Sequence, residues 1–104
     1  MTKQRSFTGN EARRLLRRGR VGTLSTLNRE GGIPYGSLAN YATDSGGRPV
    51  IMVSTLAWHT KNLQADPRAS LLVAEVPQSG DVLTGARVSV MGRFEMPEGD
   101  AVAA

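Results

Sequence analysis

The segment Ser54–Val73, STLAWHTKNLQADPRASLLV, decides the fold, because a polar stretch here separates two apolar runs. Its first half contains the only tryptophan and the only histidine of the chain, beside a lysine, an amide and three hydroxyl groups. HTKNLQAD (59–66) predicts one short helix that ends before Pro67, since the residue before a proline disfavours helical geometry. RASLLVAEV (68–76) then predicts a strand. The segment therefore predicts a crossover helix with hydrogen-bond donors gathered at its start.

Short apolar or alternating segments on both sides of this helix predict five strands. They are RVGTLSTL (20–27), IPYGSLANYA (33–42), PVIMVS (49–54), RASLLVAEV (68–76) and ARVSVMGRFE (86–95). Tight polar turns join the first three, which predicts an antiparallel meander. An open sheet of this length would leave exposed edges, so we expect a mainly β fold: an antiparallel β-barrel, closed or nearly closed, with small helices.

The pattern within these strands predicts which side chains are buried. Tyr35 and Tyr41 share one side of the second strand, and we expect both to pack inside the barrel. PVIMVS (49–54) is almost wholly apolar, so we expect it to be buried on both faces. Gly92 is expected to mark a bulge in the last strand.

A short basic helix is predicted near the N-terminus, within residues 1–19. Thr8 and Glu11 form the pattern of a capping box at its start. Gly19 stands where a residue in the left-handed conformation would end the helix. Arginines cover the face of this helix that lies opposite its leucines.

The whole chain is expected to form a single domain over residues 1–104. The basic helix occupies 1–19, the barrel strands occupy 20–96, and Pro97 with nearby acids predicts the start of another helix over 97–104. Because this last helix stops inside an apolar stretch, we expect the domain to be incomplete at its C-terminus.

Composition argues against several classes of protein. The absence of cysteine excludes disulfides, thiol catalysis and cysteine metal sites, and a single histidine argues against a zinc or copper site. No apolar run approaches the roughly 18 to 20 residues that span a bilayer. We therefore expect a cytoplasmic protein with no membrane partner.

The net charge of +4 is concentrated near the N-terminus. Residues 1–20 carry seven Lys or Arg and one acid, whereas the rest of the chain has six basic and eight acidic residues. A basic helix can bind nucleic acid, so a nucleic-acid-binding module is one interpretation of this cluster. Such clusters are more often a solvated face, and no aromatic residues are interleaved here. Nucleic acid is therefore the least favoured partner.

The donors at the start of the predicted crossover helix suit an anion. A helix start presents free backbone N–H groups and the positive end of the helix dipole. The side chains add a ring nitrogen, a hydroxyl, a charge and an amide, from His59, Thr60, Lys61 and Asn62. We interpret this group as a phosphate cradle, although a lone histidine is also common as an ordinary first-turn residue. Trp58 is more typical of packing, in a core or an interface, than of stacking on a ligand.

Together with GTLST (22–26) and PYGS (34–37), this segment resembles the FMN-binding split barrel of the pyridoxamine 5′-phosphate oxidase-like superfamily. Within that superfamily it is most similar to the N-terminal domain of the haem-utilisation branch. The match runs from about Leu15 to Glu95, and its most specific part is His-Thr-Lys-Asn-Leu followed by Asp-Pro-Arg. The resemblance implies an FMN-dependent oxidoreductase that forms a homodimer with its cofactor sites at the interface.

The same resemblance implies which residues hold the cofactor. The second strand would meet the flavin ring through its backbone, the end of the third strand would flank the ribityl chain and phosphate, and Arg87 would reach the partner's flavin. The implied cofactor-binding residues are Gly36, Ser37, Leu38, Ala39, Tyr41, Ser54, Thr55, His59, Thr60, Lys61, Asn62 and Arg87.

The chain also departs from the oxidase proper. Where the oxidase has a Ser-Arg-Lys phosphate loop, this chain has His-Thr-Lys, and the oxidase's C-terminal cofactor and substrate residues have no counterpart here. Pyridoxamine-phosphate oxidation is therefore not expected. Haem bound or degraded on the same barrel, with FMN lost, is the alternative. No catalytic residue is assigned, because no base lies near Ser37 in the sequence, and the substrate and electron donor stay open.

Overall fold

The computed structural model describes residues 8–54 and 56–95, and every structural statement below concerns these ranges. The elements are α1 (Gly9–Arg18), β1 (Val21–Leu27), β2 (Pro34–Thr43), β3 (Pro49–Ile51), α2 (Trp58–Ala65), β4 (Arg68–Ala74), the 3₁₀ turn η1 (Val82–Thr84) and β5 (Arg87–Arg93). The helix expected to start over 97–104 lies outside the described residues, as does Thr55.

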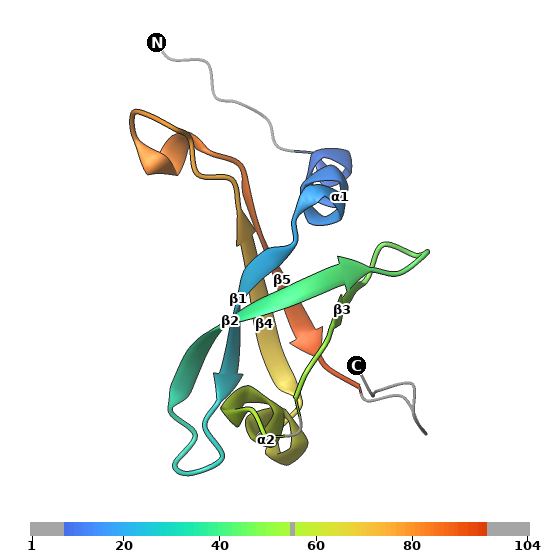
Figure 1. Cartoon of the computed structure of the whole chain (residues 1–104), viewed down its shortest axis with the longest axis vertical. Coiled ribbons are helices and arrows are strands. Elements are labelled where there is room, and N and C mark those ends of the chain that lie inside the picture. The colour runs from blue at the N-terminus through green and yellow to red at the C-terminus, as the bar shows by residue number, and fades with distance from the viewer. Residues whose placement is uncertain (1–7, 55, 96–104) are drawn as a thin grey trace.

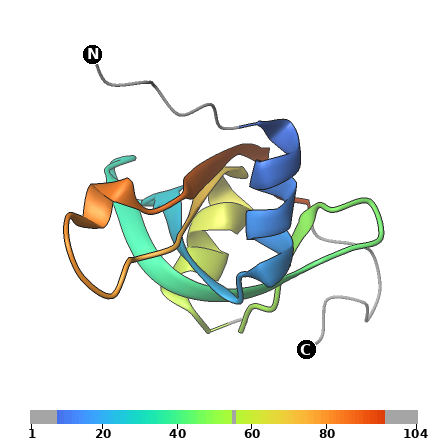
Figure 2. The same ribbon diagram turned by 90° about the horizontal axis from the view of Figure 1, so that it is seen from above.

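Five antiparallel strands form a single sheet in the order β3-β2-β1-β4-β5. The predicted meander of β1, β2 and β3 is confirmed, and α2 is the crossover that carries the chain from β3 to β4 on the other side of β1. The strands curve around a common interior, with α1 toward one end of the molecule and α2 at the other (Figure 1, Figure 2). The mainly β, antiparallel split-barrel fold is therefore confirmed as a half-barrel with two helices.

Two details of the strand prediction are wrong. PVIMVS is not buried on both faces: β3 contains only Pro49–Ile51 and pairs with β2 alone, and Val50 is 49% exposed. A run of apolar residues at a sheet edge has the same sequence signature as a buried strand. Gly92 marks no bulge, because the pairing of β4 with β5 runs without a break from Arg68 with Arg93 to Ala74 with Arg87.

The ends of α1 show one expected cap and one unexpected contact. The Thr8 Oγ1 accepts a hydrogen bond from the Glu11 N–H at 3.2 Å, so the predicted start of the helix is confirmed. The left-handed stop is wrong, because Gly19 has a φ of −70°. A Cβ added at Gly19 would overlap the Tyr41 hydroxyl and lie 2.9 Å from Val73 Cγ1. Glycine is needed there so that α1 can lie close to the sheet.

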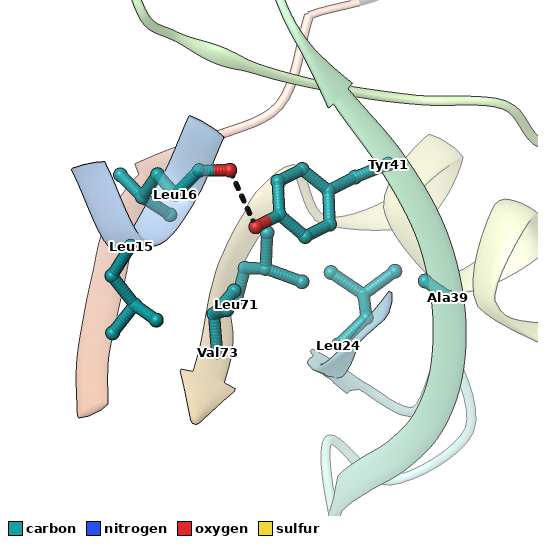
Figure 3. Packing of buried hydrophobic residues seen from close by; sticks show 7 residues of the cluster. All are labelled: Leu15, Leu16, Leu24, Ala39, Tyr41, Leu71 and Val73. Atoms are coloured by element: carbon teal, nitrogen blue, oxygen red, sulfur yellow. Dashed lines mark hydrogen bonds between the residues drawn. The ribbon is translucent and has the colours of Figure 1, made fainter. Parts of the chain in front are cut away.

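The core lies between α1 and the inner face of the sheet, and Figure 3 shows its buried residues. They are Leu15 and Leu16 from α1, Leu24 from β1, Ala39 and Tyr41 from β2, and Leu71 and Val73 from β4. The Tyr41 hydroxyl donates a hydrogen bond to the Leu16 carbonyl oxygen at 2.7 Å, and burial raises the pKa of Tyr41. Packing of Tyr41 inside the barrel is confirmed. The same expectation for Tyr35 is wrong, because that side chain is exposed at the end of β2.

A candidate ligand site at the α2 end of the barrel

Ser54 organises the turn that leads into α2. Its carbonyl oxygen accepts the Ala57 N–H at 3.1 Å and the Thr60 hydroxyl at 2.6 Å, and its own hydroxyl oxygen accepts the Leu56 N–H at 3.2 Å. Ala57 is the N-cap of α2 and offers no side-chain cap. Three hydrogen bonds to Ser54 therefore hold this turn, and they fix the orientation in which α2 begins.

Thr60 and Asn62 are completely buried and serve the fold. The Thr60 hydroxyl gives its one proton to Ser54. The Asn62 Nδ2 donates to Thr26 Oγ1 at 3.1 Å, and the Asn62 Oδ1 accepts the Arg29 N–H at 3.0 Å. These bonds fasten α2 to β1 and to the turn between β1 and β2. Within the protomer, two of the predicted phosphate donors are thus already engaged.

His59 and Ser37, which lie 22 positions apart in the sequence, meet at this end of the barrel. The His59 Nδ1 lies 3.2 Å from Ser37 Oγ, which in turn lies 3.4 Å from the Leu24 carbonyl oxygen. The His59 Nε2 is buried, and no described residue offers it a hydrogen-bond partner. A buried polar atom without a partner costs about 1–3 kcal/mol, so a contact from outside the protomer would be favourable here.

Two cations lie at the same end. The Arg29 guanidinium lies 5.1 Å from the centre of the Trp58 ring, which is a cation–π contact. Lys61 lies two residues after His59 on α2 and is half-buried. Trp58 is itself 39% exposed, so it is not a core residue, and its role in an interface stays a prediction. The contributions of Arg29 and Thr26 could not be foreseen, because each depends on a partner distant in sequence.

The other residues implied by the resemblance do not gather here within one protomer. On β2, Ala39 and Tyr41 point into the core, whereas Leu38 points to the opposite face and is exposed. Gly36 is also exposed. Arg87 stands at the start of β5 and donates hydrogen bonds to Leu83 and Gly85 carbonyl oxygens, at 2.7 and 3.3 Å.

Neither helix of the described chain is long and apolar enough to cross a membrane. Within the same residues, no three His, Cys, Asp or Glu side chains come together as a metal site. The α2 end therefore offers a different chemistry: one ring nitrogen without a partner, two cations, and exposed apolar side chains around them.

Known proteins resemble this chain in sequence and in structure. A chloroplastic non-canonical heme oxygenase of Arabidopsis thaliana is 41% identical over 83 residues, which cover 79% of this chain and 25% of that protein. A heme binding protein from Mycobacterium smegmatis is 40% identical with a TM-score of 0.80, covering 97% of this chain and 41% of that one. A FAD-binding protein from Mesorhizobium loti is 27% identical with a TM-score of 0.70, covering 90% and 64%.

This chain thus spans only a quarter of the length of its Arabidopsis relative. Residues 8–103 match the family described as Pyridoxamine 5′-phosphate oxidase. The antiparallel half-barrel, its crossover helix and this match together show that the chain belongs to the pyridoxamine 5′-phosphate oxidase family.

Proposed function

We propose that this chain binds haem at the α2 end of the barrel and does so as a homodimer. The observation that carries the proposal is the buried His59 Nε2 without a partner, since histidine is a common ligand of haem iron. The names of the Arabidopsis and Mycobacterium relatives, at 41% and 40% identity, support the same ligand.

The residues at this end fit the chemistry of haem. A porphyrin has a large apolar surface and two carboxylates, and the α2 end combines exposed apolar side chains with the cations Arg29 and Lys61. Bound haem would supply iron redox chemistry that no protein side chain provides. Because the Nε2 of His59 is buried, ligation requires that the ring be uncovered when the ligand enters.

Ser37 would position this ring. If the Ser37 hydroxyl donates its proton to the Leu24 carbonyl oxygen, it can only accept from the His59 Nδ1–H. That contact leaves the lone pair of a neutral ring on Nε2, which is the form that binds iron. Ser37 is thus a positioning residue, and no nucleophilic role is assigned to it.

FMN is the second candidate, favoured by the FAD-binding relative and by the start of α2, where Lys61 offers a positive charge. The internal bonds of Thr60 and Asn62 reduce the donors available for a phosphate dianion. We therefore rank haem first. An oxidoreductase activity and a cytoplasmic location stay predictions from the sequence, and the electron donor stays open.

Absorption spectroscopy separates the two candidates. Titration of the protein with haemin should give a saturable, shifted Soret band, whereas titration with FMN should leave flavin fluorescence unquenched at micromolar concentration. Quenching of the FMN fluorescence by the protein, without any Soret shift on haemin addition, would show that the chain binds flavin and not haem. Adding ascorbate in air to the haem-loaded protein tests degradation, which would appear as loss of the Soret band.

A matched pair of variants tests the site. His59→Ala should weaken haemin binding or change the Soret position, whereas Gln64→Ala, an exposed change on the same helix, should do neither. An identical Soret band and affinity in His59→Ala would show that another residue binds the iron. Ser37→Ala should keep the binding but broaden or shift the spectrum, because the ring loses its partner at Nδ1.

A further inference from the structure

Two unlike features lie at the end of the molecule away from α2. One is the helix α1, and the other is an arm, residues 75–86, that connects β4 to β5 (Figure 1). An ion pair joins them, because Arg18 Nη2 lies 3.1 Å from Glu75 Oε2 at the base of the arm. We call this part of the molecule, residues 8–21 and 75–87, the α1–arm end.

The helix presents positive charge to the solvent from a fixed position. Leu15 and Leu16 are buried in the core and hold α1 on the sheet. The exposed residues of α1 and of the link to β1 include Arg13, Arg14, Arg17, Arg18 and Arg20. Among residues 8–54 and 56–95, no carboxylate pairs with Arg14, Arg17 or Arg20. These guanidinium groups are therefore available to a negatively charged partner.

The arm presents aliphatic side chains beside this charge. Val76, Val82 and Leu83 are 70%, 59% and 66% exposed, and the arm contains no basic residue. Of its two carboxylates, Glu75 pairs with Arg18, and Asp81 accepts the Leu83 N–H at 2.9 Å. Exposed aliphatic groups on a projecting loop mark an interaction surface.

The main chain of the arm is already hydrogen-bonded, so the arm can leave water at little cost. The Thr84 N–H donates to the Asp81 carbonyl oxygen at 3.0 Å, and the Gly85 N–H donates to the Val82 carbonyl oxygen at 3.3 Å. Arg87 donates to the Leu83 carbonyl oxygen at 2.7 Å. Unpaired groups in these positions would oppose transfer into an apolar medium.

The combination of charge and aliphatic side chains fits an anionic lipid bilayer. The two segments of the α1–arm end carry six arginines and three carboxylates, which leaves a net positive charge. A bilayer offers negative headgroups and, just below them, apolar acyl chains. A nucleic acid would attract the arginines but would leave the aliphatic arm in water. No aromatic residue in these segments could stack on its bases either.

We propose that the α1–arm end docks on the surface of an anionic lipid bilayer. The arginines of α1 lie at the headgroups, and Val82 and Leu83 enter the boundary between headgroups and acyl chains. The expectation of no membrane partner was drawn from the lack of a spanning segment, and a surface contact needs none. Because the candidate ligand site lies at the other end, the docked chain keeps that site away from the bilayer (Figure 1).

Co-sedimentation with vesicles tests the contact. Vesicles of phosphatidylcholine and phosphatidylglycerol should pellet the chain at low salt, whereas vesicles of phosphatidylcholine alone should not. High salt should release the chain, because it screens the attraction between exposed charges. Failure to bind the anionic vesicles, or equal binding to both kinds of vesicle, would overturn the inference.

A matched pair of charge variants locates the basic part of the surface. Arg14→Gln with Arg17→Gln should weaken binding to the anionic vesicles by about 20- to 30-fold, since each basic residue near such a surface contributes roughly five-fold. Arg68→Gln with Arg93→Gln removes the same charge from residues that pair across β4 and β5 near the α2 end. This control should change the affinity by less than about three-fold. Equal effects of the two variants would contradict docking through α1.

The arm has its own matched pair. Leu83→Ser should weaken binding to the anionic vesicles by about ten-fold, because an apolar side chain no longer leaves water. Val50→Ser removes an exposed aliphatic side chain from β3 and should leave the affinity unaltered. An unchanged affinity in Leu83→Ser would show that the arm does not enter the bilayer.

The single tryptophan reports which end meets the bilayer. Trp58 lies at the α2 end, so brominated lipids in the anionic vesicles should leave its emission unquenched. Leu83→Trp combined with Trp58→Phe moves the only tryptophan to the arm, and brominated lipids should quench its emission. Quenching of Trp58 in the wild-type chain, or no quenching at position 83 in bound protein, would refute the orientation.

Two results would assign the α1–arm end to a different partner and overturn the inference. Retention on DNA that is lost in Arg14→Gln with Arg17→Gln, without binding to vesicles, would assign the arginines to nucleic acid. A dimer that dissociates in Leu83→Ser during size-exclusion chromatography would place the arm against a second copy of the chain. Circular dichroism checks that each variant is folded. None of these experiments uses haem, so their outcome is independent of the proposed ligand.

Discussion

Asn62→Ala tests whether this buried amide serves the fold more than a ligand. The change removes the bond from Nδ2 to Thr26 and the bond that Oδ1 accepts from the Arg29 N–H. Each bond contributes about 1 kcal/mol net, and a buried partner left unpaired adds about 1 kcal/mol or more. Alanine returns about 0.5 kcal/mol through its helix propensity. The expected loss is about 2–3 kcal/mol, or roughly 10–20 °C in Tm for a chain of this size.

Urea unfolding followed by circular dichroism measures this loss, with Gln64→Ala as the exposed control on α2. A cycle with Thr26→Val isolates the amide–hydroxyl bond and should give a coupling energy of about 1 kcal/mol. A loss below about 0.5 kcal/mol for Asn62→Ala, together with a loss of ligand binding, would refute the structural role. The amide would then belong to the ligand site, as the resemblance implied.

Three further changes test the core and one ion pair. Tyr41→Phe should cost about 1 kcal/mol, because the Leu16 carbonyl oxygen loses its donor. Burial raises the pKa of Tyr41, so wild-type stability should fall as pH rises above 10.0, and the Phe variant should lack this fall in alkaline thermal melts. Gly19→Ala should cost about 1–3 kcal/mol in urea unfolding, because its Cβ would overlap Tyr41. Hydrogen bonds from Arg68 lower the pKa of Asp66 to about 2, below its ordinary 3.8. The stability lost in Asp66→Asn should therefore be present above pH 4 and disappear as pH falls toward 2, as thermal melts across this range would show.

The sequence predicts the local structure of this chain well, because local structure depends on local patterns. The helix over 59–66 and the Thr8 cap follow from short-range rules and are found in the structure. The prediction that PVIMVS is buried on both faces is wrong, because an apolar run does not reveal whether a second strand lies beside it. The left-handed stop predicted at Gly19 is wrong, because the glycine is required by the close approach of Tyr41, which lies 22 residues further along the chain. The register of the sheet brings these positions together, and no local pattern encodes it.

The same limit applies to the candidate site. His59, Thr60 and Asn62 lie within four consecutive positions of the sequence, and by residue type alone each of them could donate a hydrogen bond to a phosphate. The structure separates them, because Thr60 and Asn62 point into the fold while the His59 Nε2 has no described partner. Their partners, Ser54 and Thr26, follow from the turn and from the packing of α2 on β1.

The difference between Thr60 and Asn62, which bond within the fold, and His59, whose Nε2 has no described partner, decides between the two candidate ligands. A phosphate dianion needs several donors converging on one point, and the internal bonds of Thr60 and Asn62 leave Lys61 and the backbone N–H groups at the start of α2 for that role. A large, mainly apolar ligand needs fewer polar contacts and more covering surface. One unpaired ring nitrogen, flanking cations and an apolar rim meet that need, provided that something covers the rim.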